Sequence, residues 1–345
     1  MSPDPGGSGP SKEICMQIAV LGAGAWGTAL ANLLAQKGYR VVLWGRDPEQ
    51  MERMRRLGEN ERLLPGVRLS SNLELTSDLE ETLDQASFTL LAVPCQYLRS
   101  VLERAKSCFA SGPSLVCASK GIELASLKPM SAVVAEALQY KQPNYAVLSG
   151  PSFAEEVSQG QPTAVSLGCA DLALAEELQR VLSTDRFRVY TNQDYAGVEL
   201  GGAIKNVMAL ATGICDGLGF GQNARAGLIT RGLAEMSRLG SSMGGSPDTF
   251  MGLSGIGDLV LTCTGSLSRN RRVGLRLGAG EGLESILSGM QSVAEGVKTT
   301  EALHRLGRKK GVELPITDQI YAILTQGKEV EVAVQELMTR ELKGE

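Results

Sequence analysis

A lysine in an otherwise apolar stretch is the first residue whose setting suggests chemistry. Lys205 lies in VELGGAIKNVMALATGICDGL, 198–218, shortly after the pair Gly201-Gly202. Because glycine pairs cost helix stability, they favour close approach of another backbone or of a ligand. Apolar neighbours would remove water from the ammonium group, which would lower the lysine pKa and favour proton donation. The alternative is a lysine whose ammonium group extends to solvent.

Histidine chemistry is limited, because the chain has one histidine, His304. One histidine excludes a His-rich metal site and argues against a Ser-His-Asp triad. Its basic surroundings predict an ordinary exposed helix residue rather than a catalytic one. The seven cysteines form no C-x-x-C pair, which argues against a zinc site or a disulfide framework and favours a reducing compartment. We therefore expect no metal, and acid–base chemistry by Lys, Asp, Glu, Tyr or Cys.

Two other polar segments in the second half could complete a site. Asp258, in GLSGIGDLVLTCTG, could pair with a catalytic lysine or cap a helix. In GSLSRNRRVG, Ser268 is typical of a helix N-cap, and Arg269, Asn270 and two further arginines follow it. A helix start favours anions over cations, so these arginines favour a bound phosphate. The alternative is a solvated basic face with acidic neighbours.

Three glycines with the spacing G-x-G-x-x-G stand in LGAGAWGTALA, 21–31. Gly22 would allow a tight turn, Gly24 would let the backbone approach a pyrophosphate, and Gly27 would let a helix pack closely on a strand. The free N–H groups of the helix start would then face the phosphates. Because a strand precedes the motif and a helix follows it, the motif predicts dinucleotide binding. The alternative is a glycine-rich turn without a ligand.

The next strand ends in LWGRD, 43–47, where an NAD-binding fold would carry an acid for the ribose 2′-hydroxyl. Gly45 would leave room there, and Arg46 offers a planar cation for a 2′-phosphate. The segment therefore favours NADP over NAD. Asp47 is either a displaced ribose-binding acid or the N-cap of a helix that begins at Pro48, and we favour the cap.

The scaffold expected around these residues is a Rossmann-like doubly wound sheet of the α/β class, followed by an all-helical substrate domain. Short apolar strands alternate with helical patterns such as 28–37, which ends at Gly38. The strands are continuously apolar, as parallel strands covered on both faces are. The expected strands are 17–22, 40–44, 88–94, 114–121, 145–151 and 163–168.

Helical patterns replace the strands after about residue 194. The expected helices are 195–218 with an interruption at Gly201-Gly202, 224–239, 269–277, 297–310, 315–324 and a last one after Val330. The boundary is a change of composition rather than a linker, so we expect two tightly packed domains. We divide the chain into a disordered leader 1–13, a dinucleotide-binding domain 14–193 and a helical substrate domain 194–345.

Composition excludes other classes of protein. The 345 residues are 43% apolar and carry a net charge of −4, so nothing indicates nucleic-acid binding or an anionic membrane surface. No run approaches the ~18 apolar residues of a membrane span. The leader is rich in Pro, Gly and Ser and does not resemble a signal peptide. We expect a cytoplasmic protein.

Several motifs together resemble one family, the bacterial-type NAD(P)-dependent sn-glycerol-3-phosphate dehydrogenases. The resemblance implies reduction of dihydroxyacetone phosphate to sn-glycerol 3-phosphate by NAD(P)H, for glycerophospholipid synthesis. It also implies a helical substrate domain and a homodimer. The motifs, spread over 17–330, are IAVLGAGAWGTALA, LWGRD, ASKGIE, LSGPSFAEE, GVELGGAIKNVMALATGICDGLGFGQNARAGLITRGLAEMSRLG, MGLSGIGDLVLTCTGSLSRNRRVG and VAEGVKTTEAL.

The resemblance also assigns roles by matching motif positions. Lys205 would donate and accept the proton, held by Asp258, while Lys120 would contact both substrate and cofactor. The other substrate-binding residues would be Gly150, Ser152, Asp258, Ser268, Arg269 and Asn270. The cofactor-binding residues would be Gly22, Gly24, Ala25, Trp26, Gly27, Arg46, Ala154, Arg269, Val293 and Glu295.

Two competing hypotheses remain. One is a related NADP-dependent reductase of a non-phosphorylated hydroxyacid, against which the cluster Ser268-Arg269-Asn270 argues. The other is a nucleotide-sensing protein without catalysis, in which Lys205, Lys120 and Asp258 would be structural.

Overall fold

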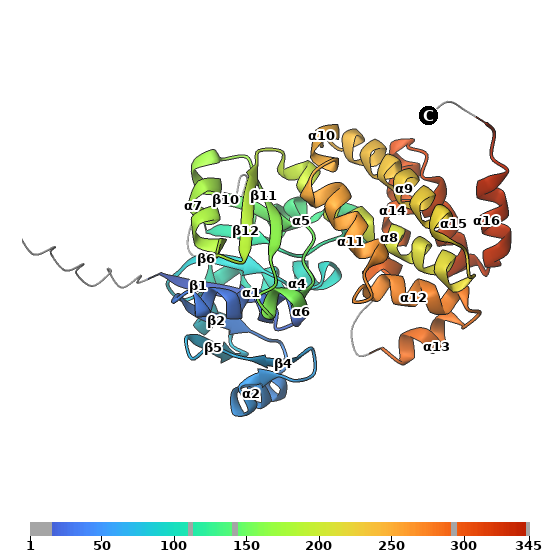
Figure 1. Cartoon of the computed structure of the whole chain (residues 1–345). Helices are drawn as coiled ribbons and strands as arrows, with labels where there is room; N and C mark the ends of the chain where they lie inside the picture. Colours follow the sequence, from blue (N-terminus) through green and yellow to red (C-terminus); the bar gives the residue numbers. More distant parts are fainter. Residues whose placement is uncertain (1–15, 110–112, 140–143, 291–294, 343–345) are drawn as a thin grey trace, which may run out of the picture.

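The chain folds into an α/β part and a helical part that lie against each other (Figure 1). The computed structural model describes residues 16–109, 113–139, 144–290 and 295–342. The α/β part runs from β1 (Gln17–Leu21) to β12 (Phe187–Asn192), and the helical part begins with α8 (Tyr195–Gly217). Two residues, 193 and 194, therefore join the two parts.

The α/β part is built on an eight-stranded sheet with the order β12-β11-β10-β7-β6-β1-β2-β5. All neighbouring strands are parallel except β10 and β11. From β1 the chain goes to β2 on one side and returns to β6 on the other, so a crevice is expected beyond the carboxyl end of β1. The other strands are β2 (Arg40–Trp44), β5 (Leu73–Thr76), β6 (Ala86–Leu91), β7 (Ser114–Cys117), β10 (Asn144–Ser149) and β11 (Thr163–Cys169).

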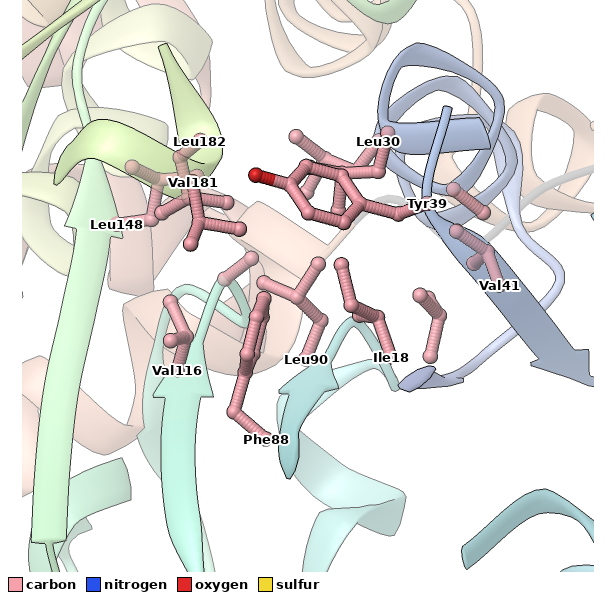
Figure 2. Close-up of a cluster of buried hydrophobic side chains, with 14 of the residues drawn as sticks. Ile18, Leu30, Tyr39, Val41, Phe88, Leu90, Val116, Leu148, Val181 and Leu182 are labelled. Carbon is pink, nitrogen blue, oxygen red and sulfur yellow. The ribbon is translucent and has the colours of Figure 1, made fainter. Parts of the chain in front are cut away.

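Helices cover both faces of this sheet. Figure 2 shows one side of the core, where Leu30 and Tyr39 pack over Ile18 and Leu90, with Leu182 nearby. A second cluster, which includes Leu98 and Val133, fills the opposite face. The helices are α1 (Ala25–Gln36), α2 (Pro48–Leu57), α3 (Leu79–Leu83), α4 (Cys95–Ala105), α5 (Met130–Leu138), α6 (Ala154–Ser158) and α7 (Leu172–Leu182), with a 3-10 turn η1 (Lys106–Cys108). Two short hairpins, β3 (Glu59–Asn60) with β4 (Leu64–Arg68) and β8 (Ile122–Glu123) with β9 (Lys128–Pro129), complete this part.

The predicted fold class is confirmed, and all six expected strands form. The expectation of parallel strands throughout was wrong at β11, because the connection 150–162 holds only the short helix α6 and does not return the chain to the other end of the sheet. Strands β5 and β12 were missed. Both are edge strands in which buried and exposed residues are mixed, so neither is a continuous apolar run.

The helical part is organised around α8, in which every residue from Gly197 to Cys215 is buried. This helix is long and apolar enough to cross a membrane, but its apolar window is 100% buried within the chain, as in a core helix. The expectation that no run approaches the ~18 apolar residues of a membrane span did not anticipate a helix of this length and hydropathy. Around it lie α9 (Gln222–Ser242), α10 (Pro247–Phe250), the π-helical turn η2 (Leu253–Gly257), α11 (Asp258–Thr264), α12 (Arg269–Gly278), α13 (Leu283–Ser288), α14 (Glu295–Lys310), α15 (Pro315–Gln326) and α16 (Val330–Met338).

Candidate active site

A cleft of about 1260 Å³ lies between the α/β part and the helical part. One wall is the glycine turn after β1 together with the segments that follow β2 and β6. The other wall comes from α8, α11 and the start of α12. The cleft therefore lies beyond the carboxyl end of β1, where the strand order places a ligand crevice.

Two lysines that line this cleft share one carboxylate buried behind the lining. Lys205 donates a hydrogen bond to Asp258 Oδ1 at 2.5 Å, and Lys120 donates one to Asp258 Oδ2 at 2.8 Å. Lys205 is 8% exposed and Asp258 is 1% exposed. The alternative in which Lys205 extends to solvent is excluded, because its ammonium group is buried against Asp258 at the wall of the cleft.

The glycine pair before Lys205 explains how Asp258 comes so close. A Cβ at Gly201 would lie 2.4 Å from the Ser254 carbonyl oxygen, and one at Gly202 would lie 2.5 Å from Ser149 Oγ. The turn η2, which leads directly into Asp258, therefore packs on the bare backbone of α8. Of the two expected neighbours of the glycine pair, a backbone or a ligand, the structure shows a backbone. The expected interruption of the helix was wrong, since α8 runs through both glycines.

Burial sets the protonation chemistry of this cluster. Loss of water lowers the pKa of Lys205 to about 8, with Asp258 opposing the change and Lys120 adding to it. Burial alone would raise the pKa of the Asp258 carboxyl, but the two lysines hold that pKa below its ordinary value. The cluster thus contains an ionised carboxylate and a lysine able to give up its proton near neutral pH.

The glycine turn has the packing that a dinucleotide requires. A Cβ at Gly22 would lie 2.6 Å from the Ala92 carbonyl oxygen, and one at Gly27 would lie 1.9 Å from the Gly22 oxygen. A Cβ at Gly24, by contrast, would meet no atom within 4 Å, so the cleft approaches the backbone there. The start of α1 has no side-chain cap, and the buried Trp26 indole nitrogen has no partner in the described ranges. These donors fit the phosphates of a dinucleotide.

The segment after β2 resolves the two alternatives for Asp47. Its side chain accepts a hydrogen bond from Glu49 N at 3.1 Å, with Pro48 as the first helical residue, so the helix-cap interpretation is confirmed. The interpretation of Gly45 was wrong. A Cβ there would lie 2.1 Å from Met51 Sδ, so the glycine makes room for Met51 rather than for a phosphate. Arg46 is exposed and lines the cleft.

The arginines at the start of α12 have two different environments: one forms an ion pair within the chain and one faces the cleft. Ser268 caps the helix by accepting from Arg271 N at 3.3 Å. Arg271 pairs with Asp216 at 2.6 Å, as the alternative of a basic face with acidic neighbours requires. Arg269 is exposed, lines the cleft and has no ion pair within the described part of the chain. Asn270 accepts from Gly296 N at 3.0 Å, which ties α14 to this end of the site.

Close packing of α12 on α8 fixes the start of α12 relative to Lys205. A Cβ at Gly213 of α8 would lie 2.1 Å from the Arg271 carbonyl oxygen, and one at Gly274 of α12 would lie 2.2 Å from the Leu210 oxygen. The backbones of α8 and α12 therefore touch, so Arg269 is held at a set distance from Lys205.

Most of the expected site residues meet at the cleft. Gly27, Gly150 and Asp258 lie behind its lining: Gly150 adopts φ +143° and its carbonyl accepts from Lys120 at 3.3 Å. Val293 lies outside the described residues. Those that line the cleft are Gly22, Gly24, Ala25, Trp26, Arg46, Lys120, Ser152, Ala154, Lys205, Ser268, Arg269, Asn270 and Glu295.

Glu295 is the half-buried acid among these lining residues. Its carboxylate accepts from Cys95 N at 3.2 Å. Burial raises the pKa of Glu295, and the field of Arg269 opposes that rise. The residue therefore links the first turn of α14 to the start of α4 across the two parts of the chain.

Sequence reasoning missed Asn206 and Thr262, which line the cleft beside Lys205. Thr262 donates to the Asp258 carbonyl at 2.6 Å. Its position four residues after Asp258 on one helix could have indicated it. His304 was expected to be exposed, and this was wrong: it is half-buried, lies 2.7 Å from Asp318 and stacks on Tyr321. It does not line the cleft.

Comparison with known proteins points to one family. The sequence model of the NAD-dependent glycerol-3-phosphate dehydrogenase N-terminus matches residues 17–175, and that of its C-terminus matches 194–335. A glycerol-3-phosphate dehydrogenase [NAD(P)+] from Nitratidesulfovibrio vulgaris is 58% identical over 330 residues, which cover 96% of this chain and 100% of the relative. One from Maridesulfovibrio salexigens is 56% identical with the same coverage. The crystal structure of glycerol-3-phosphate dehydrogenase from Coxiella burnetii, 43% identical, superposes with a TM-score of 0.91 over 94% of this chain and 99% of that one.

Proposed function

Because the chain belongs to the NAD-dependent glycerol-3-phosphate dehydrogenase family, we propose that Lys205 is the general acid with which it reduces dihydroxyacetone phosphate to sn-glycerol 3-phosphate. The chain is an oxidoreductase that uses NAD or NADP. The observation that carries the residue assignment is the buried cluster Lys205–Asp258–Lys120 at the wall of a cleft that also holds the glycine turn.

Lys205 supplies the proton. A reduced nicotinamide bound on the glycine turn would supply the hydride for the carbonyl carbon, and negative charge would then develop on the carbonyl oxygen. An ammonium group with a pKa of about 8 is charged at neutral pH and gives up its proton readily. A positioned acid of this kind accelerates the reaction by roughly 10²–10⁴-fold.

Asp258 and Lys120 position and assist that acid. Asp258 holds the two ammonium groups on its two oxygens, which orients Lys205 toward the cleft. Lys120 adds a second positive charge beside the developing oxyanion. The side chains of Lys120, Lys205 and Asp258 are 15%, 10% and 1% exposed, so water is largely excluded around them. Their electrostatic effect therefore exceeds that of the same groups in solvent.

Arg269 anchors the phosphate of the substrate. Its guanidinium is exposed to the cleft and unpaired within the described ranges, next to the capped start of α12. A planar guanidinium and the N–H groups of a helix start are both suited to a phosphate. Anchoring the remote phosphate orients the carbonyl group for transfer.

The experiment that tests this function is an initial-rate comparison of dihydroxyacetone phosphate with dihydroxyacetone, using NADPH and NADH in turn. We expect turnover with the phosphate ester and little with the free triose. Equal rates would support a reductase of non-phosphorylated substrates. Binding of NADPH without reduction of either compound would support the nucleotide sensor.

We also propose that the protein acts in the cytoplasm as a homodimer and prefers NADP to NAD. The resemblance supports the first two points, and Arg46 at the end of β2 supports the third. The product then serves glycerophospholipid synthesis. Analytical ultracentrifugation of the full chain tests the dimer.

A further inference from the structure

A second arginine, Arg62, lies at the same end of the cleft as Arg46. Both residues line it, together with Asp47 and Gln50. Both are exposed, and neither has a hydrogen bond or ion pair within the part of the chain that the structure describes. We propose that Arg62 is a second residue that binds the 2′-phosphate of NADP and so sets the preference of this chain between NADP and NAD. The inference rests on the proposed function in that the cleft takes a nicotinamide dinucleotide.

The hairpin that carries Arg62 is anchored on both sides of it. Two residues earlier, Asn60 is 1% exposed and donates to the Ala23 carbonyl at 3.2 Å and to Thr28 Oγ1 at 2.8 Å. Two residues later, Leu64 is buried against Ala29 of α1. Arg62 is therefore held in place relative to the glycine turn and the helix that receives the phosphates.

The segment that carries Arg46 is tied to the same point. Gln50, in the first turn of α2, also donates to the Ala23 carbonyl at 3.2 Å. One carbonyl of the glycine turn thus holds both arginine-bearing segments, β3–β4 through Asn60 and α2 through Gln50. A ligand bound on the glycine turn meets two guanidinium groups whose backbones are already positioned, which favours binding because little ordering is required.

Three of the carboxylates near Arg62 have partners elsewhere. Asp47 caps α2. Glu61 pairs with Arg53, and Glu59 accepts from Gly66 N at 2.8 Å. Arg46 and Arg62 therefore remain without an anionic partner, although both stand at the rim of one cleft. A phosphate monoester carries about −1.5 to −2 charges near pH 7 and accepts hydrogen bonds from two guanidinium groups at once. NAD has only a hydroxyl at this position, which needs neither arginine.

The test is isothermal titration calorimetry of the full chain with NADPH and with NADH, which reads binding and not turnover. We expect Arg62→Ala to raise the Kd for NADPH by about tenfold, as expected for loss of a hydrogen bond to a charged group, and to change the Kd for NADH less than about twofold. Arg62→Lys should recover part of the loss, because it keeps the charge but not the planar fork. Thermal melting confirms that each variant is folded.

Arg56→Ala is the matched control. Arg56 is an exposed arginine of α2 without an ion pair among the described residues, and it does not line the cleft. It should leave both Kd values nearly unchanged. The proposal is overturned if Arg62→Ala leaves the NADPH Kd unchanged, if it raises both Kd values equally, or if Arg56→Ala weakens NADPH as much.

The proposed function fails by a different result. A wild-type chain that reduces no dihydroxyacetone phosphate would refute the function, while the ratio of NADPH to NADH binding would still report on Arg62. Conversely, normal turnover with an unchanged NADPH Kd in Arg62→Ala would refute only this inference.

Discussion

The two ends of the cleft use positive charge in opposite ways. At one end, Lys205 and Lys120 are largely buried and share Asp258. At the other, Arg46 and Arg62 are exposed and unpaired within the described ranges. Burial lowers the pKa of Lys205 and makes it an acid, whereas exposure leaves the two arginines free to bind an anion. The comparison indicates that the reactivity of Lys205 depends on its burial beside Asp258. Recognition of the cofactor phosphate depends instead on exposed arginines that have no anionic partner within the described ranges.

The largest expected effect is at the buried end. Lys205→Ala removes the proton donor, so kcat for dihydroxyacetone phosphate should fall by roughly 10²–10⁴-fold. The Kd for NADPH, measured by calorimetry, should change little, because the cofactor binds mainly through the glycine turn. A variant that turns over normally would show that Lys205 is not the acid.

Loss of the phosphate anchor should have an intermediate effect. Arg269→Ala should raise KM for dihydroxyacetone phosphate by about 10- to 100-fold, because a hydrogen-bonded charge pair with the substrate is lost. The measurement is the steady-state KM of this variant and of the control Arg308→Ala. Arg308 is an exposed arginine of α14 that does not line the cleft. An unchanged KM would place the substrate phosphate elsewhere.

The smallest effect is expected at the exposed end. Arg46→Ala should raise KM for NADPH by about tenfold and hardly alter KM for NADH, since one charged contact to the 2′-phosphate is lost. An unchanged ratio of the two KM values would remove Arg46 from cofactor selection and break the contrast between the two ends.

Local features of the site could be predicted from the sequence, and distant ones could not. The glycine turn and the Asp47 cap depend on neighbouring residues, so their spacing was sufficient. The pairs that Asp258 forms with Lys205 and Lys120 join residues 53 and 138 positions apart. The residues alone left a pair between Asp258 and a catalytic lysine as one of two alternatives, and the resemblance favoured Lys205–Asp258. Gly45 was misread because Met51, which fills the space beside it, belongs to the next helix. Arg62 lies between two short strands, where no periodic pattern marks it.

For the fold too, features that depend on residues distant in the sequence could not be predicted. The central strands were recognised because burial on both faces makes them continuously apolar. The edge strands β5 and β12, the reversal at β11 and the turn η2 depend on contacts made only in the folded chain. The turn η2 matters most for function, because it places Asp258 against α8.

The pH dependence of the reaction in both directions tests the central claim most directly. Burial lowers the pKa of Lys205 to about 8 in the free protein, and the acid must be protonated for reduction and neutral for oxidation. We therefore expect kcat/KM for reduction of dihydroxyacetone phosphate to fall as pH rises through about 8, and kcat/KM for oxidation of sn-glycerol 3-phosphate to rise through the same value. Asp258→Asn, which removes the carboxylate that favours the charged lysine, should move both transitions to lower pH. Profiles that stay flat between about pH 6.5 and 9.5 would contradict the assignment of Lys205 as the acid.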